Sequence, residues 1–512
     1  MSNSEMIMLC AIGLYMAFTL FIGIKSSREN NNVGDFYLGG RRLGPIVTAM
    51  SAEASDMSGW LLMGLPGVAY LSGIADAGWT AIGLAIGTYV NWLLVAKRLR
   101  KYSAKCEAIT VPDFFAARYR DKTNILVGVA AVIIVVFFIP YTASGFSACG
   151  KLFSSLFNID YHIAMIISGI VILSYTSLGG FLAASKTDLV QSIVMSIALV
   201  IVLSFGIGSA GGIGEVIDNA KSLPGYLGMT TSYDAAADAS SDYGLLTIIS
   251  TMAWGLGYFG MPHILLRFMA IEDSRKLKLS RRIASVWVVI SLAVATFIGV
   301  IGLAMSKAGE IPQLEGSDSE TVIVKIAHTL SDYNYLFAFV AGIILAGIFA
   351  STMSTADSQL LAASSSVSEN IIGRVFGVKL SAKAQMLAAR ITLVVIAVIG
   401  IILAWDPNSS VFKIVSFAWA GFGATFGPVM LLALFWKRSN KWGAMAGMLT
   451  GGAMVFIWKF AISKAGGVFA IYELLPAFIC ACLVNVIVSL LTPAPEQEIL
   501  DEFEAVKAEI KE

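Results

Sequence analysis

The polar stretch Ser51-Ala-Glu-Ala-Ser-Asp-Met-Ser-Gly59 interrupts an otherwise apolar run at residues 45–68. An apolar run of about 20 residues is long enough to cross a bilayer as a helix. Backbone groups that are freed at membrane depth must line a cavity or be covered by protein. The stretch therefore predicts a broken helix inside a membrane protein, with the break turned towards a cavity.

A second apolar run, at residues 245–270, contains a similar interruption, Gly255-Leu-Gly-Tyr-Phe-Gly-Met-Pro262. Paired interrupted helices in corresponding positions of two halves indicate a transporter binding site. Because four apolar runs separate the two, each half would hold five helices and run in the opposite orientation. We expect a five-plus-five inverted repeat, with repeats at about residues 45–209 and 245–436.

The composition places the whole chain in a membrane. Of the 512 residues, 57% are hydrophobic and 13% are charged, whereas soluble proteins carry about 25% charged residues. The net charge of +1 excludes the basic surface of a nucleic-acid-binding protein. Recurring apolar runs predict an all-α integral membrane protein with about thirteen transmembrane helices. The expected spans start near Met6, Pro45, Ala75, Asn124, His162, Thr187, Leu245, Ile283, Leu336, Met386, Val411, Ala444 and Tyr472.

Basic residues gather in alternate loops, for example at 97–105 and 275–282, whereas the loop at 211–244 is acidic and rich in glycine. An excess of Lys and Arg marks the cytoplasmic side. This pattern predicts an N-terminus outside and a C-terminus in the cytoplasm. We expect one transmembrane transporter domain at residues 1–492, and a cytoplasmic tail with a short surface helix at residues 493–512.

Enzymatic signatures are absent from the sequence, which has no phosphate loop, dinucleotide fingerprint or nucleophile elbow. No loop is long enough to fold into a soluble catalytic domain. We expect a transporter rather than an enzyme, with a small-molecule substrate and the lipid bilayer as its partners. No obligatory protein partner is evident.

Asp56 lies in the first interruption. A carboxylate at mid-membrane costs about 2.5–3.5 kcal/mol or more, so a cation, a proton or a buried partner must offset it. The carboxylate either binds an ion or makes a structural hydrogen bond to freed amides. Glu53, one turn earlier, is either a second acidic group beside Asp56 or a residue that faces the cytoplasmic vestibule, and we expect the vestibule.

Hydroxyl side chains form a stripe in the ninth run, because positions i, i+3, i+4 and i+7 share one helix face. The stripe consists of Ser351, Ser354, Thr355 and Ser358. Such hydroxyls often bond back to the preceding turn. Four in register favour a site for a hard cation such as sodium, completed by carbonyls of the broken helix.

Asp188 lies at the expected cytoplasmic start of the sixth run. It is either an ordinary helix-start carboxylate or part of an ion exit gate or second cation site. His263 and Arg267 follow the second break, and we expect both to anchor the helix at the membrane interface.

Several aromatic residues adjoin the helix breaks. They are Trp60, Tyr141, Trp254 and Tyr258. Singly, each is typical of packing or of the interfacial belt. Together they predict a pocket for a small amphipathic solute, with aromatic walls and with helix N-terminal amides for a carboxylate.

Specific strings carry a resemblance to a known family. They are Tyr37-Leu-Gly-Gly-Arg-Arg-Leu-Gly44, Ser55-Asp-Met-Ser-Gly-Trp-Leu-Leu-Met-Gly-Leu-Pro-Gly67, Trp254-Gly-Leu-Gly-Tyr-Phe-Gly260 with Pro262-His263, and Met353-Ser-Thr355. The chain resembles the sodium:solute symporter family over nearly its whole length, and most closely the bacterial branch that carries proline. The resemblance implies one helix before the inverted repeat and two after it, alternating access, and a place in the bacterial plasma membrane.

The resemblance also implies functional residues. Its sodium site uses the backbone of Ala54, Met57 and Ser351 and the hydroxyls of Ser354 and Thr355. Asp56, Ser58 and Gly59 match positions that couple sodium to substrate, and Asp188 matches a carboxylate linked to cation passage. The proline pocket corresponds to Trp60, Tyr141, Trp254 and Tyr258.

Two residues depart from the family pattern. Glu53 replaces an expected glycine, and Met261 replaces an expected glutamine before Pro262-His263. At Met261 an adaptable apolar side chain stands where a hydrogen-bonding one is expected. Another small amino or carboxylic acid therefore stays open as the substrate, as does a sodium-independent channel or sensor on the same scaffold.

Overall fold

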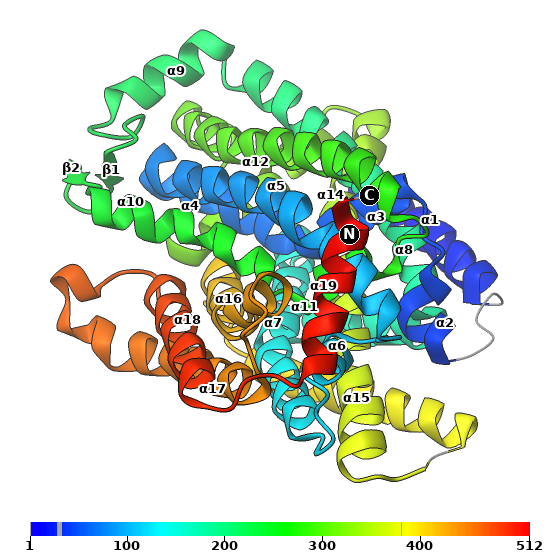
Figure 1. The fold of residues 1–512 in the computed structure, drawn as a ribbon. Coiled ribbons are helices and arrows are strands. Elements are labelled where there is room, and N and C mark those ends of the chain that lie inside the picture. The colour runs from blue at the N-terminus through cyan, green and yellow to red at the C-terminus, as the bar shows by residue number, and fades with distance from the viewer. Residues whose placement is uncertain (1, 28–32, 380, 512) are drawn as a thin grey trace.

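The computed structural model describes residues 2–27, 33–379 and 381–511, most of which are helical (Figure 1). The elements of the first half are α1 (Asn3–Ser27), α2 (Val33–Leu38), α3 (Pro45–Asp56), α4 (Leu65–Ser72), α5 (Ile74–Lys105), α6 (Val111–Arg118), α7 (Ile125–Phe157), α8 (Tyr161–Ser209), α9 (Ile213–Ser222), β1 (Thr231–Asp234) and β2 (Ala239–Asp242). Those of the second half are α10 (Leu245–Met252), α11 (Pro262–Ala270), α12 (Leu277–Ala308), α13 (Val322–Ser331), α14 (Tyr335–Ser365), α15 (Ala382–Leu403), α16 (Val411–Phe435), α17 (Lys441–Phe460), α18 (Leu474–Leu491) and α19 (Gln497–Lys511).

Among the described residues, 10 helices are long and apolar enough to cross a bilayer, or 11 if one bent pair counts as a single span. Shorter apolar helices at Trp60–Ser72 and Tyr161–Ser174 add to these. A helix is present at every expected span, so a helical multi-pass architecture is confirmed. The count of about thirteen stays a prediction, as does the inverted repeat.

Both interrupted runs are broken helices. α3 ends at Asp56, and Met57 leaves helical geometry with φ −76° and ψ 73°. In the second run, the 3-10 helix Ala253–Phe259 follows α10, and α11 begins at Pro262 after a bend of 45°. Proline suits this start because it lacks the N–H that a first turn leaves unbonded.

α8 is a single long element where two spans are expected. Its break is at Gly180, whose φ of 65° and ψ of −178° are open to glycine but costly for other residues. Asp188 therefore lies two turns inside the second half of α8. The expectation that Asp188 stands at a helix start is wrong, because the kink occurs earlier than the sequence suggests.

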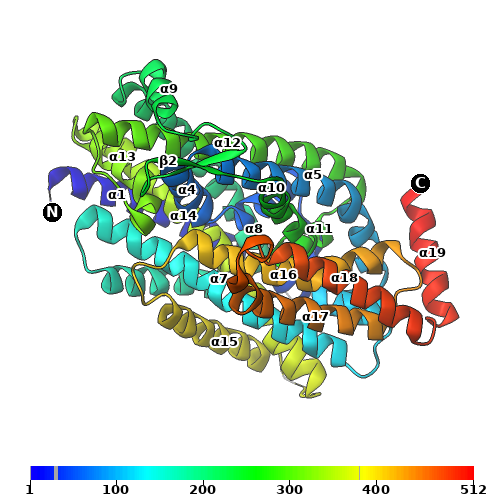
Figure 2. The same ribbon diagram turned by 90° about the vertical axis from the view of Figure 1, so that its left-hand side faces the viewer.

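The helices pack as one bundle, with α14 against α8 and α1, α5 against α12, and α16 against α17 and α18. Figure 2 shows the two termini at opposite ends of this bundle. The antiparallel β1–β2 hairpin and α9 lie towards the end that carries the N-terminus. Both helix breaks lie inside the bundle, where neighbouring helices cover the freed backbone groups.

The tail forms the expected surface helix, α19, which packs against the end of α5 (Figure 1). Its buried apolar face consists of Ile499, Phe503 and Val506. The guanidinium of Arg118 lies 5.1 Å from the ring centre of Phe503. At the rim, Lys105 pairs with Glu509 at 3.2 Å.

Candidate functional site

The break after α3 leaves a backbone carbonyl that aromatic side chains satisfy. The carbonyl oxygen of Asp56 accepts hydrogen bonds from the Trp60 indole at 3.0 Å and the Tyr141 hydroxyl at 3.3 Å. Gly59 packs against α7 so closely that a Cβ there would lie 2.8 Å from Cβ of Ala148. Two of the predicted pocket residues, Trp60 and Tyr141, thus hold the break itself.

The Asp56 carboxylate connects the two broken helices. Its Oδ2 accepts a hydrogen bond of 2.7 Å from the Tyr258 hydroxyl, in the 3-10 segment of the second break. Its Oδ1 has no hydrogen-bond partner among the described residues. The side chain is completely buried. A carboxylate at this depth needs compensation by a cation, a proton or a buried partner, and no protein group in the described part of the chain supplies it at Oδ1.

Hydroxyls of α14 reach the same break. Ser354 Oγ donates to the Ala54 carbonyl at 2.6 Å, and Thr355 Oγ1 lies 3.5 Å from it. Both also donate to the Ser351 carbonyl, and Ser358 bonds back to Ser354, so the back-bonding expected of such residues occurs as well. Neutral carbonyl and hydroxyl oxygens therefore converge where α3 ends, and hard cations prefer such ligands.

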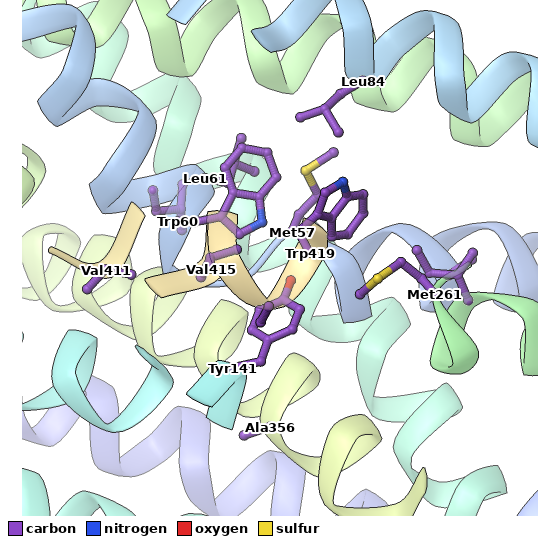
Figure 3. Close-up of a cluster of buried hydrophobic side chains, with 14 of the residues drawn as sticks. Met57, Trp60, Leu61, Leu84, Tyr141, Met261, Ala356, Val411, Val415 and Trp419 are labelled. Atoms are coloured by element: carbon purple, nitrogen blue, oxygen red, sulfur yellow. The ribbon is translucent and has the colours of Figure 1, made fainter. Parts of the chain in front are cut away.

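The four predicted aromatic residues lie together around the breaks. Trp60 and Trp254 have ring centres 6.0 Å apart. The cluster includes a residue that sequence reasoning missed, Trp419 of α16 (Figure 3). Its ring stands edge-on to that of Tyr258, with ring centres 5.1 Å apart. Trp419 Nε1 donates to the Trp254 carbonyl at 2.8 Å. It was missed because it lies within an uninterrupted apolar run, where a tryptophan is typical of packing.

The remaining predicted residues of the first break lie in the same place. Ser58 and Met57 are buried beside the aromatic cluster, and Ser58 Oγ lies 3.4 Å from the Trp60 amide. Met261 is fully buried at the start of α11 and belongs to the same apolar cluster (Figure 3). The departure at Met261 therefore makes this side of the cluster more apolar.

Asp188 belongs to a separate, fully buried polar network. Its Oδ2 accepts from Ser51 Oγ at 2.6 Å and from Arg267 Nη2 at 3.2 Å. Arg267 also donates to Ser51 at 3.0 Å and to Ser358 at 2.6 Å. One network thus joins α3, α8, α11 and α14. Asp188 lies far from the aromatic cluster in the chain, but both share the α3 segment.

Three further expectations are wrong. Arg267 and His263 are 1% and 0% exposed, so neither anchors a helix at the membrane interface. Glu53 is 1% exposed and faces α5, where its Oε1 accepts from the Trp92 indole at 2.9 Å. Arg267 and Glu53 meet polar partners on helices that are distant in sequence. The His263 ring packs against Phe138 and Tyr141 of α7.

A model of the sodium:solute symporter family matches residues 36–451. The chain belongs to the sodium:solute symporter family. The matched region contains both breaks, the α14 hydroxyls and Asp188.

Characterised relatives of this symporter extend over nearly its whole length. It is 42% identical to the sodium/proline symporter of Haemophilus influenzae, covering 98% of this chain and 97% of the relative. It is 40% identical to the osmoregulated proline transporter OpuE of Bacillus subtilis, with 95% of each chain covered.

Two solved transporter structures share the fold of this symporter. A substrate-bound, outward-open sialic acid symporter superposes with a TM-score of 0.77 at 17% identity, over 96% of this chain and 99% of the other. The nucleobase-cation-symport-1 family transporter Mhp1 gives a TM-score of 0.54 at 12% identity, over 93% and 99% of the two chains. At these identities the likeness concerns the fold alone.

Proposed function

We propose that this protein carries proline into the cell together with sodium by alternating access. The relatives that extend over its whole length are named as sodium/proline symporters and proline transporters. One observation carries the proposal. The α14 hydroxyls of Ser354 and Thr355 meet the Ala54 carbonyl where α3 breaks, directly beside the buried aromatic cluster.

Sodium would bind between α3 and α14. The proposed ligands are the backbone carbonyls of Ala54, Met57 and Ser351 and the hydroxyl oxygens of Ser354 and Thr355. Ser354 and Thr355 already lie beside the Ala54 carbonyl, so an ion would replace their hydrogen bonds to it as α3 and α14 move slightly apart. Sodium would thereby bridge the broken helix to α14.

Proline would bind in the cluster beside this ion, against residues Ser58, Gly59, Trp60, Tyr141, Trp254 and Tyr258. The methylene groups of the proline ring are small and apolar, and aromatic faces cover such a body well. Its carboxylate would use amides exposed at the helix breaks. Buried Met261 adds apolar surface, which suits the methylene groups of the ring. Another small amino or carboxylic acid is the alternative substrate.

Asp56 would couple the two ligands. Its backbone carbonyl is held by Trp60 and Tyr141, and its carboxylate is held by Tyr258. An ion that steadies the end of α3 would therefore also position three pocket residues. Such coupling is reciprocal, so proline would raise the affinity for sodium by the same factor.

Asp188 would act in cation passage on the cytoplasmic side. The buried Asp188–Arg267 pair connects α8 to α11, and Ser51 ties both to α3. Separation of these helices would break the pair and open a polar path. This arrangement supports an exit gate in preference to a simple structural carboxylate.

The topology belongs to the same proposal. An N-terminus outside and a cytoplasmic C-terminus require an odd number of spans, and termini at opposite ends of the bundle in Figure 2 support this. About thirteen spans would comprise one helix before the inverted repeat and two after it. The transporter domain would cover residues 1–492, and α19 would lie in the cytoplasm.

The driving force is sufficient for accumulation. Moving one charge through 100 mV releases about 2.3 kcal/mol, and a tenfold sodium gradient adds about 1.4 kcal/mol. At one sodium per proline these would sustain roughly 500-fold accumulation.

Labelled proline uptake into proteoliposomes tests the proposal. We expect accumulation only with an inward sodium gradient, and loss of accumulation when choline replaces sodium. Uptake that proceeds equally in choline would reject symport and favour a channel. Competition by other small amino and carboxylic acids at equal concentration checks the substrate. A competitor that binds more tightly than proline would be assigned as the substrate in its place.

A further inference from the structure

Two buried carboxylates lie one turn apart at the end of α3. Glu53 and Asp56 are 1% and 0% exposed, and no Lys or Arg among the described residues pairs with either one. The C-terminal end of a helix carries partial negative charge, which disfavours carboxylates there and favours a cation. Two ionised carboxylates at this end of α3 would therefore need a cation beside them.

Each carboxylate has one oxygen engaged and one oxygen unpaired. Oε1 of Glu53 accepts from the Trp92 indole at 2.9 Å, and Oδ2 of Asp56 accepts from the Tyr258 hydroxyl at 2.7 Å. Oε2 of Glu53 and Oδ1 of Asp56 have no hydrogen-bond partner within the described part of the chain. Trp92 and Tyr258 thus fix the orientation of both groups while leaving an acceptor on each.

The facing helix, α5, presents more unpaired oxygens. Positions 88, 91 and 92 share one helix face by their spacing, and Trp92 already contacts Glu53. Asn91 Nδ2 donates a hydrogen bond to the Tyr258 carbonyl at 3.0 Å, so its Oδ1 stays available as an acceptor. This Oδ1 and Thr88 Oγ1 are buried, and neither has a partner among the described residues.

We propose a second sodium site between α3 and α5, formed by side-chain oxygens of Glu53, Asp56, Thr88 and Asn91. Two carboxylates, a hydroxyl and an amide oxygen are the ligand types of hard cations. The site is distinct from that at Ala54, because the Ala54 ligand is a backbone carbonyl beside the α14 hydroxyls, whereas the Glu53 ligand is a side-chain oxygen beside α5.

The inference rests on the proposed sodium symport. Counting the sodium ions bound to the purified full-length protein distinguishes failure of the second site from failure of the proposed symport. With radioactive sodium, wild-type protein should bind about two ions per chain, and Glu53→Gln about one. Thr355→Ala, which damages the Ala54 site, should also bind about one. Absence of sodium binding in wild type would reject both proposals, whereas a wild-type count of about one would overturn only the second site.

Thr88→Val provides a variant that keeps the side-chain shape, in case Glu53→Gln fails to fold. It should weaken one of the two binding steps by about tenfold. The matched control is Thr80→Val, because Thr80 lies on α5 with an equally buried and unpartnered hydroxyl. Thr80→Val should bind sodium like wild type. Unchanged binding in both Glu53→Gln and Thr88→Val would overturn the second site.

Discussion

Asp188 and Arg267 form an ion pair of 3.2 Å in which both side chains are almost completely shielded from solvent. Removing one member of a buried pair leaves the other charge without compensation, which costs about 3–5 kcal/mol. We expect Asp188→Asn to lower the free energy of unfolding by about 3 kcal/mol. Thermal unfolding in detergent, followed by tryptophan fluorescence, measures this.

The exposed pair of Glu272 with Lys276, at 2.6 Å, is the control. Water already solvates both groups, so Glu272→Gln should leave the unfolding temperature unchanged. Equal destabilisation by the two substitutions would contradict a structural role for the buried pair.

Ser354→Ala should weaken sodium activation. It removes the hydroxyl closest to the Ala54 carbonyl, and we expect the sodium concentration for half-maximal uptake to rise about tenfold. Proline affinity at saturating sodium should change far less. Ser365→Ala is the matched control, because Ser365 is also buried on α14 and donates only to the Ala362 carbonyl. The assignment fails if Ser354→Ala and Ser365→Ala give the same sodium curve.

Tyr258→Phe should impair the response to both ligands. It deletes the hydrogen bond to the Asp56 carboxylate while keeping the ring against Trp419. A hydrogen bond to a charged group is worth about 1.5–3 kcal/mol, so proline KM at low sodium should rise roughly tenfold or more. Tyr119→Phe is the control, because it removes the buried hydroxyl contact with Ser439. It should leave the proline KM at low sodium unchanged. A shift confined to sodium affinity would argue against coupling through Tyr258.

The docking of α19 should depend more on apolar burial than on its ion pairs. Exposed ion pairs contribute about 0–1 kcal/mol each, whereas truncating a buried phenylalanine costs about 3 kcal/mol. Spin-label distances between α19 and α5 should stay unchanged in about 1 M salt and lengthen in Phe503→Ala. Release of α19 by salt but not by Phe503→Ala would reverse this ranking.

Gly257→Ala should abolish uptake. A Cβ at this position would collide with the indole of Trp419. The rigid ring cannot move without breaking its bond to the Trp254 carbonyl. Gly208→Ala, on α8 with no atom near the new Cβ, should transport like wild type. Normal proline uptake by Gly257→Ala would show that the cluster can open there.

Local sequence patterns predicted the features that local chemistry determines. Asp56-Met57-Ser58 and Gly255–Pro262 indicated the two breaks because glycine, proline and polar residues weaken a membrane helix. The spacing of Ser354 and Thr355 indicated their common face. The break of α8 was expected just before Thr187 but lies at Gly180, because a Gly179-Gly180 pair in an apolar run is also typical of an unbroken membrane helix.

Long-range partners could not be predicted. From the sequence, Arg267 is predicted to be an interfacial anchor, but in the fold it pairs with Asp188 of α8. Glu53 is predicted to be solvated, but it is buried against Trp92 of α5. Trp419 lies in an apolar helix with no polar neighbour to mark it. In each case the function depends on which helix packs opposite, and that choice follows from the whole bundle.

The contact between Gly257 and Trp419 also constrains how this protein can evolve. A side chain at position 257 requires a smaller residue at position 419, because the two occupy the same space. A smaller residue at 419 alone leaves a cavity unless position 257 carries a larger side chain. Single substitutions at either site therefore pass through an unfit intermediate. Directed evolution of a new substrate range should randomise the two positions together, because one-at-a-time libraries would discard the variants that enlarge the pocket.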